Sequence, residues 1–302
     1  MEKILITTPA GNVGLATLRQ LANHPNRPNL MLVAGVLSTG KTTSDAVSPS
    51  TALSEAIALT DRQIPLDFAR PDTFAKALTG VSRVLLVRPP ALADVNRYFR
   101  PFIEAMQRAE VQQVVFLSLQ GVENNTVTPH HKIEKLIREA GLGYTMLRPS
   151  FFMQNLSTTH RAEIRDRSEI FVPAGHGRTS FVDVRDLAEV AAQALATGQH
   201  LNTALELTGP EASTYTEIAS ILTDVLGRTI TYRNPSVLRF LWQKVIVEKQ
   251  KLGFVLVMVA LYTVAKLGKA GGLTNTLAGL LNREPTPFRQ FAEDTKSVWF
   301  QS

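Results

Sequence analysis

The chain has 302 residues, of which 44% are hydrophobic and 19% charged, a composition typical of a globular protein rather than a disordered one. It contains no cysteine, which excludes disulfides, thiolate metal sites and a cysteine nucleophile. Its formal net charge of +6 comes from basic residues scattered without a long Lys/Arg run. We therefore expect a solvated basic surface and no nucleic-acid partner.

The first eighteen residues predict a strand, a glycine-containing turn and a helix. Residues 4–6 form a short apolar run, and Leu15, Leu18 and Leu21 then follow at helical spacing. A turn in this position points backbone N–H groups and the positive end of a helix at an anion. Gly11 would let the backbone approach a pyrophosphate, and Gly14 would let the helix pack closely on the strand. The turn is therefore a candidate nucleotide-binding element.

Apolar runs and helical patterns then alternate along the first half of the chain. The expected strands are residues 30–37, 64–68, 84–87, 114–117 and 144–147, and the expected helices are residues 51–59, 71–78, 95–108 and 132–140. This alternation predicts an α/β fold with a doubly wound parallel sheet of the Rossmann type. In such a sheet the ligand lies at the carboxyl ends of the strands, which here are residues 8–14, 38–41, 67–68, 87–90 and 118–122.

The second half has shorter strand candidates, at residues 169–173, 179–182 and 204–207, and two clear helices, at 186–197 and 215–226. The second of these helices is expected to be capped by Ser213 or Thr214, with Glu217 behind, and to end at Gly227. We expect a nucleotide-binding domain over residues 1–149, with returning segments from about 178–208. Residues 150–302 are expected to form a smaller, mostly helical domain on the substrate side.

Residues 252–265 form an apolar segment of fourteen residues without a charge, between Lys251 and Lys266. A membrane span needs about twenty residues, so the pattern favours a buried helix, a pocket wall or a homodimer face over membrane insertion. We expect no membrane span and no signal peptide, since the first strand begins at Lys3. A cytoplasmic protein fits this pattern.

Residues 35–42 match the phosphate-loop pattern G-x-x-x-x-G-K-[ST] in full. A phosphate loop must open directly into a helix, whereas residues 43–49 have the composition of a loop. Gly35 also falls inside the apolar strand rather than after it. A nucleoside triphosphatase is therefore the minor interpretation.

The end of the second strand fits the adenosine half of a dinucleotide site better. An NAD site places an acidic residue about twenty positions after the glycine turn. This chain has Ser38, Thr39 and Lys41 there, and no carboxylate before Asp45. Hydroxyl groups and a lysine suit a 2′-phosphate, so NADP(H) is favoured over NAD(H). The alternative is a polar surface loop that binds nothing.

Five stretches of the chain resemble the NmrA-like family of atypical short-chain dehydrogenase/reductases, which includes quinone and azo-dye reductases and non-enzymatic redox sensors. They are residues 6–14, 134–155, 181–188, 206–211 and 282–291. The resemblance implies that the pyrophosphate is held by Thr8, Pro9, Ala10, Gly11, Asn12, Val13 and Gly14. It also implies that Ser38, Thr39 and Lys41 hold the 2′-phosphate or ribose.

By the same resemblance, Asp67 and Phe68 would border the adenine, and Val87, Arg88 and Pro89 would pass under the cofactor. The family commonly has a small residue where Arg88 stands, so Arg88 is expected to bind a cofactor phosphate or an acidic substrate, or else to be a surface arginine at a strand end. The nicotinamide and the substrate would lie near Phe151, Phe152 and Asn155. Asp183 and Asp186 are interpreted as structural carboxylates.

The reductase chemistry is predicted less completely. Ser118 takes the place of the serine that follows the fifth strand in short-chain reductases, but no tyrosine stands four residues before Lys132. Lys132 would then orient the nicotinamide ribose, or act with His131 as the acid that follows hydride transfer. The alternative for these residues is a solvated helix start. Since reduction of a quinone or azo bond needs hydride more than a strong proton donor, the missing tyrosine does not exclude it.

No His/Asp/Glu spacing of the metal-site type occurs, and no G-x-S-x-G nucleophile elbow. The function that the sequence predicts is an NADP(H)-dependent oxidoreductase that transfers hydride to a small conjugated acceptor such as a quinone. The alternative is a sensor that binds NADP(H) without turnover and acts through a protein partner. An isomerase or epimerase of nucleotide sugars is weakened by the missing tyrosine.

Overall fold

In a computed structural model that describes residues 1–37 and 49–300, the chain divides into two compact units. The first comprises Met1–Pro149 with Val184–Leu207, and the second comprises Ser150–Asp183 with Thr208–Ser302. Residues 178–183, which the sequence analysis placed with the returning segments of the first domain, belong to the second unit.

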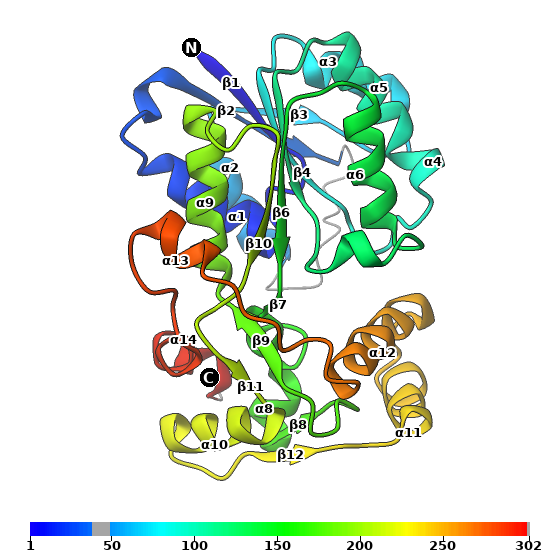
Figure 1. Cartoon of the computed structure of the whole chain (residues 1–302), viewed down its shortest axis with the longest axis vertical. Helices are drawn as coiled ribbons and strands as arrows, with labels where there is room; N and C mark the ends of the chain where they lie inside the picture. Colours follow the sequence, from blue (N-terminus) through cyan, green and yellow to red (C-terminus); the bar gives the residue numbers. More distant parts are fainter. Residues whose placement is uncertain (38–48, 301–302) are drawn as a thin grey trace. The chain divides into compact units, whose positions relative to one another are not determined.

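The first unit is built on a seven-stranded parallel sheet in the order β10-β6-β5-β4-β1-β2-β3 (Figure 1). Its strands are β1 (Glu2–Ile6), β2 (Leu30–Val36), β3 (Arg62–Pro65), β4 (Arg83–Val87), β5 (Gln113–Leu117), β6 (Tyr144–Pro149) and β10 (Thr203–Leu207). The parallel, doubly wound sheet that the alternation predicted is confirmed. The strand at residues 203–207 returns from the second half of the chain to pair with β6.

Helices cover both faces of this sheet (Figure 1). On one face α1 packs against α9 and α2, and on the other α5 packs against α3 and α6. The helices of the unit are α1 (Asn12–Ala22), α2 (Pro49–Ala58), α3 (Phe74–Leu78), α4 (Val95–Tyr98), α5 (Arg100–Arg108), α6 (Pro129–Glu139) and α9 (Val184–Thr197). Short 3₁₀ turns cover Arg27–Asn29, Pro71–Thr73 and Val122–Asn124.

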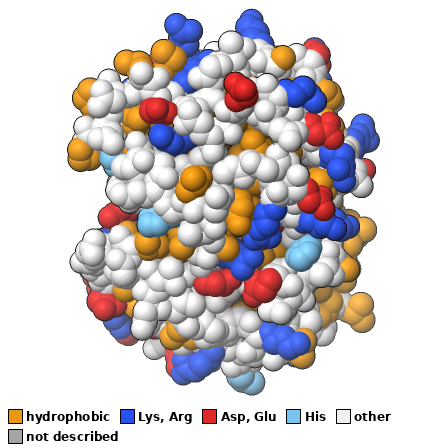
Figure 2. All heavy atoms as spheres, turned by 45° about the horizontal axis from the view of Figure 1, so that its top comes forward, with side chains coloured by type: hydrophobic (Ala, Val, Ile, Leu, Met, Phe, Trp, Pro, Cys, Tyr) orange, Lys and Arg blue, Asp and Glu red, His pale blue; other side chains and the backbone are white. Residues whose placement is uncertain are grey.

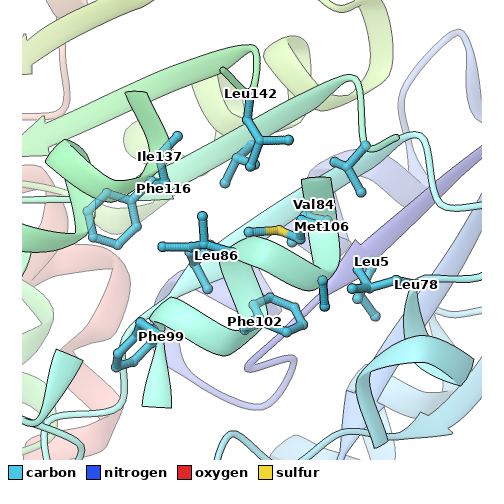
Figure 3. Packing of buried hydrophobic residues seen from close by; sticks show 14 of the residues in the cluster. Leu5, Leu78, Val84, Leu86, Phe99, Phe102, Met106, Phe116, Ile137 and Leu142 are labelled. Carbon is cyan, nitrogen blue, oxygen red and sulfur yellow. The ribbon is translucent and has the colours of Figure 1, made fainter. Parts of the chain in front are cut away.

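The core between the sheet and α5 is a continuous apolar cluster (Figure 3). Phe99, Phe102 and Met106 come from the helix side, and Leu5, Val84, Leu86 and Phe116 come from the strands. Burial of side chains of this size contributes roughly 1.5–3 kcal/mol each. The alternating pattern of the sequence therefore corresponds to helices packed on the sheet through a shared apolar core.

Several element boundaries differ from the expectation, among them the following three. The helix expected over 95–108 is interrupted at Phe99, two residues before Pro101, because a proline has no N–H to continue the helical hydrogen-bond ladder. The third strand ends at Pro65 rather than at residue 68. The helix expected from Lys132 begins at Pro129, since the Thr128 hydroxyl accepts from the His131 N–H and a proline at the first position fits the helix.

The second unit has two small sheets and is mostly helical. One sheet has the order β11-β9-β7, from Ala212–Ser213, Thr179–Val182 and Phe151–Phe152, and the other pairs β12 (Thr231–Arg233) with β8 (Glu169–Phe171). Its helices are α7 (Gln154–Ser157), α8 (Arg161–Arg167), α10 (Tyr215–Leu226), α11 (Val237–Leu241), α12 (Leu252–Lys266), α13 (Thr276–Leu281) and α14 (Phe288–Thr295). A π-helix covers Trp242–Val247, and a 3₁₀ turn covers Lys296–Trp299.

The apolar segment at residues 252–265 is a helix, as expected, but it is not a buried one. Only Val255, Met258, Tyr262 and Ala265 of α12 are buried. Among the described residues no helix combines the length and the apolar character needed to cross a membrane. On the face drawn in Figure 2, Lys and Arg side chains lie among Asp and Glu side chains.

Candidate functional site

The strand order places the switch point of the first unit between β1 and β4. The connection from β1 leads through α1 to β2 on one side, and the connection from β4 leads to β5 on the other. A crevice forms at the carboxyl ends of two strands whose connections diverge in this way. The side chain of Thr7 joins these two ends, because its hydroxyl donates to the Leu85 carbonyl at 3.0 Å and accepts from the Val87 N–H at 3.1 Å.

The turn after β1 leaves the start of α1 open toward this edge. Gly11 is the N-cap residue in an extended conformation, so no side chain caps the helix, and no acidic residue stands in its first turn. The Gly11 N–H donates to the Thr8 carbonyl at 3.1 Å, which closes the turn. The first N–H groups of a helix have no partner within the helix, so this end is arranged to receive an anion.

Gly14 is required by the close packing of the turn on the helix. A Cβ at this position would lie 2.0 Å from the Thr8 carbonyl oxygen, which no side chain can accept. This close packing is the reason that the sequence predicted for a glycine at position 14. A Cβ at Gly11 would lie 3.4 Å from the same oxygen, an ordinary contact. Packing against the residues that the structure describes therefore leaves Gly11 free to be replaced, and its expected reason is an approaching ligand.

The Thr8 hydroxyl is buried and has no hydrogen-bond partner within the described residues. A buried hydroxyl without a partner loses its hydrogen bonds to water, at a cost of roughly 1–3 kcal/mol. A phosphate oxygen held at the start of α1 would accept a hydrogen bond from it. The turn residues therefore fit the pyrophosphate of a dinucleotide.

The end of the second strand can be followed only in part. Gly35 is a paired residue of β2 opposite Ile64, and a Cβ there would lie 2.8 Å from Cδ2 of Leu66. Its glycine is therefore explained by packing within the sheet, which supports the rejection of a phosphate loop. Ser38, Thr39 and Lys41 lie outside the described residues, so their role at a 2′-phosphate stays a prediction.

Asp67 and Phe68 stabilise the loop after β3. The Asp67 carboxylate accepts from the Ala69 N–H at 2.9 Å, and the Phe68 ring packs 5.0 Å from Phe99 and 5.2 Å from Phe102, centroid to centroid. Phe68 is 5% exposed, so its ring belongs to the core. Their predicted place beside an adenine rests on the position of the loop.

Arg88 is folded into its own loop. Its Nη1 donates to the carbonyls of Pro89, Pro90 and Leu92 at 3.1, 3.1 and 3.2 Å. Burial lowers the pKa of its guanidinium, and its buried Nε has no hydrogen-bond partner in the part of the chain that the structure describes. Arg88 is therefore not an ordinary surface arginine, because it holds the loop that follows β4 at the switch point. Its contact with a phosphate stays a prediction.

Ser118 takes part in a buried ion network. Its hydroxyl donates to Oε1 of Glu134 at 2.6 Å, and Arg148 binds both oxygens of that carboxylate at 3.0 and 2.8 Å. Burial alone would raise the pKa of Glu134. Hydrogen bonds from Arg148 and Ser118, together with the charge of Arg148, outweigh this effect, so the pKa of Glu134 lies below its ordinary value. The Ser118 hydroxyl is therefore engaged in structure whether or not it also acts in chemistry.

The first turn of α6 presents two histidines and a lysine. Burial and the charge of Arg88 lower the pKa of His130 to about 3, although the charge of Glu134 acts in the opposite direction. The His130 ring is therefore neutral. His131 donates from Nδ1 to the Val122 carbonyl at 3.1 Å, since a carbonyl can only accept. Lys132 is exposed. Because α6 follows β5, all three lie at the carboxyl edge of the sheet.

The predicted substrate residues belong to the second unit. Phe151 and Phe152 form β7 and pair with Phe181 and Val182 of β9, and Asn155 lies in α7. Gln154 donates to the buried Asp183 carboxylate at 2.7 Å, which fits the structural interpretation of Asp183. A contribution of these residues to one site with the glycine turn stays a prediction.

The sequence assigned no site role to three residues at this edge: Thr7, Glu134 and His130. The four-residue spacing of His130 and Glu134 does place both on one helix face, but it does not reveal the partners of either side chain. Thr7 gave no signal, since a threonine at a strand end is common in any turn.

The sheet order, the switch point and the uncapped glycine turn define the first unit as a Rossmann-type dinucleotide-binding domain. The family model of the NmrA-like family matches residues 2–264. The chain belongs to the NmrA-like family, as the sequence motifs predicted.

Comparisons with individual proteins agree with this membership. Agroclavine dehydrogenase of Claviceps fusiformis is 33% identical over 233 residues, which is 74% of this chain and 78% of that protein. The NAD(P)H azoreductase of Xenophilus azovorans is 34% identical over 170 residues, 55% of this chain and 59% of that protein. These proteins place the chain in a family of NAD(P)H-dependent oxidoreductases.

A solved structure shares the fold over almost the whole chain. The NADPH-dependent quinone oxidoreductase QOR2 from Escherichia coli, complexed with NADPH, superposes with a TM-score of 0.80 at 21% identity, covering 98% of this chain and 99% of that chain.

Proposed function

We propose that this chain is an NADP(H)-dependent oxidoreductase that transfers hydride to a small conjugated acceptor of the quinone type. The observation that carries the proposal is the start of α1 at the switch point. There a glycine N-cap leaves the helix end open, and the buried Thr8 hydroxyl has no hydrogen-bond partner in residues 1–37 and 49–300. An azoreductase and a quinone oxidoreductase among the similar proteins support the choice of acceptor.

The turn from Thr8 to Gly14 would hold the pyrophosphate through its backbone N–H groups and the Thr8 hydroxyl. Ser38, Thr39 and Lys41 would bind the 2′-phosphate, which is the reason to prefer NADP(H) over NAD(H). Asp67 and Phe68 would border the adenine, and the loop of Val87, Arg88 and Pro89 would line the cofactor's path. When bound, the nicotinamide supplies the hydride.

The residues on α6 would manage the proton that accompanies reduction. Because Nδ1 of His131 bonds to the Val122 carbonyl, Nε2 is the ring nitrogen free to exchange a proton. The exposed ammonium of Lys132 is suited to a ribose hydroxyl or to a developing oxyanion. Ser118 would assist while bonded to Glu134. The aromatic side chains of Phe151 and Phe152, with the amide of Asn155, would contact a flat apolar acceptor.

Cofactor binding is tested by titrating the protein with NADPH and with NADH, followed by the fluorescence of the reduced nucleotide. We expect tighter binding of NADPH, and loss of that preference in Lys41→Ala. Thr8→Val should weaken both nucleotides while leaving the unfolding temperature unchanged or raised, because the variant removes a buried hydroxyl without a partner. Equal, weak binding of both nucleotides by the wild type would contradict the proposal.

Turnover is tested by following NADPH oxidation with a panel of quinones. Steady oxidation, reduced at least tenfold by Lys132→Ala with NADPH binding retained, would support the reductase and the role of Lys132. Tight NADPH binding without oxidation by any acceptor would instead support a sensor that signals through a protein partner. The binding titration and the turnover assay therefore separate the two functions.

A further inference from the structure

The exposed apolar side chains of this chain are concentrated in one segment. Of the fifteen exposed large apolar residues among the described ones, eleven lie between Leu238 and Leu273. This segment comprises α11, its π-helical continuation and α12, which contact one another. We call residues 237–273 the apolar helix pair. Scattered single apolar residues need no explanation, but exposed apolar residues concentrated in one segment indicate an interaction site.

The helix α12 has two apolar faces. Val255, Met258, Tyr262 and Ala265 follow one another at helical spacing and are buried in the second unit. The opposite face carries Leu256, Val257, Leu261 and Val264, each at least 40% exposed. A helix that is apolar all round is normally buried on all sides. Half of this one is left uncovered by the residues that the structure describes.

The preceding helix is held in place by charge and presents a second exposed row. Lys244, 1% exposed, contacts the buried carboxylate of Glu163 and bonds to Glu248 at 2.9 Å. This ion pair fixes the π-helical turn from its inner side. Leu238, Trp242 and Ile246, spaced four residues apart, lie exposed on the outside. The two exposed rows therefore belong to helices that are held in place by buried contacts on their opposite faces.

The charges around these rows are almost all positive. Residues 237–273 contain six basic side chains and one acidic one, so the segment carries +5 of the chain's formal +6. Lys244 and Glu248 pair with each other. Five exposed cations remain, none of which has a salt bridge within residues 1–37 and 49–300, and these are Arg239, Lys249, Lys251, Lys266 and Lys269.

We propose that the apolar helix pair docks this protein on an anionic membrane surface. An apolar row with lysines at its border matches the acyl region and the acidic headgroups of one lipid leaflet. Trp242 has the side chain that is enriched at this depth. With 15 residues, α12 is about 22 Å long and lies in the plane of the interface rather than across it.

Charge favours a lipid surface over a second copy of this chain. Two copies joined through this face would bring their five unpaired cations together, and like charges in contact disfavour association. Acidic lipids neutralise the same cations. The proposal does not depend on the reductase chemistry. Docking would place the proposed reductase at the bilayer, in which many quinones dissolve.

Fluorescence of the full chain tests the proposal without a cofactor. The protein has two tryptophans, and Trp299 is 0% exposed whereas Trp242 is 58% exposed. Vesicles of phosphatidylcholine with phosphatidylglycerol should shift the emission to the blue and sediment the protein. Vesicles of phosphatidylcholine alone should do so at least tenfold more weakly, and added salt should reverse the binding. Trp242→Phe should lose the shift and still sediment.

Matched variants separate this surface from the rest of the protein. Leu256→Gln should lower the partition constant at least fivefold, and its control is Leu201→Gln, because both leucines are 50% exposed. Lys249→Gln and Lys251→Gln should each lower it about fivefold, whereas the exposed Lys76→Gln should not. Equal loss in the control variants would contradict the proposed surface.

Two results would overturn the proposal. One is a folded wild-type protein that does not sediment with phosphatidylglycerol vesicles at low salt. The other is a dimer in analytical ultracentrifugation that Leu256→Gln dissociates, which would assign the surface to a second copy of this chain. Neither result bears on NADPH binding or turnover, so failure here is distinguishable from failure of the proposed function.

Discussion

The Ser118 hydroxyl donates a 2.6 Å hydrogen bond to Glu134, a carboxylate that is only 2% exposed and is also bound by Arg148. Removing one partner of a buried pair leaves the other charge uncompensated. We therefore expect Glu134→Gln to lower the free energy of unfolding by about 2–4 kcal/mol. Its control is Glu139→Gln on the same helix, whose exposed pair with Lys135 should change stability by less than about 0.5 kcal/mol. Urea denaturation measures both.

The same bond separates structure from chemistry at Ser118. Ser118→Ala removes one hydrogen bond to a charged group, which is worth roughly 1.5–3 kcal/mol of stability. If Ser118 is catalytic, kcat of the variant should also fall at a temperature where the variant is fully folded. Lost stability could not explain such a fall. The measurement is kcat with a quinone acceptor beside a thermal melt. Normal turnover in a folded Ser118→Ala would leave this residue only its structural role.

Acid should weaken the second unit through Glu163. Burial raises the pKa of this carboxyl, but the charge and hydrogen bond of His160 and the charge of Lys244 lower it, to about 2. Because the folded pKa lies below the ordinary value of 4.5, the carboxylate stabilises the fold above about pH 4.5. This contribution is lost progressively as the pH falls from 4.5 toward 2.

Glu163→Gln tests this linkage. The variant should be less stable than the wild type by about 3–5 kcal/mol at pH 7, and the difference should narrow as the pH falls below 4.5. Denaturant titrations at a series of pH values measure it. Asp166→Asn, at an exposed neighbouring position, is the control. A difference that stays constant down to pH 3 would show that the charge of Glu163 is not what stabilises the unit.

Substitutions of Gly11 and Gly14, the two glycines of the turn, should differ in their effect on stability. Gly14→Ala forces a Cβ to within 2.0 Å of the Thr8 carbonyl oxygen, so we expect a loss of about 3 kcal/mol or more. Gly279→Ala is the control, because it lies in α13 with open space around it and should stabilise by about 0.5–1 kcal/mol. Thermal unfolding compares them.

Gly11→Ala completes this test. Its Cβ meets only an ordinary contact of 3.4 Å, so the variant should fold with nearly normal stability. Loss of NADPH affinity in that stable variant would locate the ligand at the turn. Unchanged affinity would show that the backbone at Gly11 does not approach the cofactor.

Helix α10 offers a prediction that follows from local sequence alone. The Thr214 hydroxyl accepts from the Glu217 N–H, and the Glu217 carboxylate accepts from the Thr214 N–H at 2.7 Å, which completes the capping box. Thr214→Ala should cost about 1 kcal/mol in urea denaturation. Thr216→Ala, at an exposed position without a capping role, should stay within about 0.5 kcal/mol. An equal loss in both variants would contradict the capping role.

Much of the fold could be predicted because its information is local. The apolar runs that became β1, β2, β4 and β5 are short, and each is followed by a helical pattern, so element type and alternation were legible. The boundaries of the elements were harder to predict. The break at Phe99 and the start of α6 at Pro129 both depend on prolines whose effect on the flanking residues is easy to underrate.

The candidate site was predictable only at the glycine turn. Gly14 could be assigned from its spacing, because the reason for it is contact with a backbone atom six residues earlier in the chain. The partners of Ser118, Arg88 and Thr7 come from residues that lie nearby only after folding or from the course of a loop. No sequence pattern marks such contacts.

The sequence by itself determined the parallel α/β architecture, the family and the position of the glycine-containing turn, since these follow from periodicity and short motifs. Only the tertiary structure decided that Ser118 is bound to Glu134, that Arg88 holds its own loop, and that α12 leaves one apolar face uncovered. The physical reason is that burial and pairing depend on which distant segments pack together. Apolar character alone cannot distinguish a helix covered on both faces from one that is half exposed.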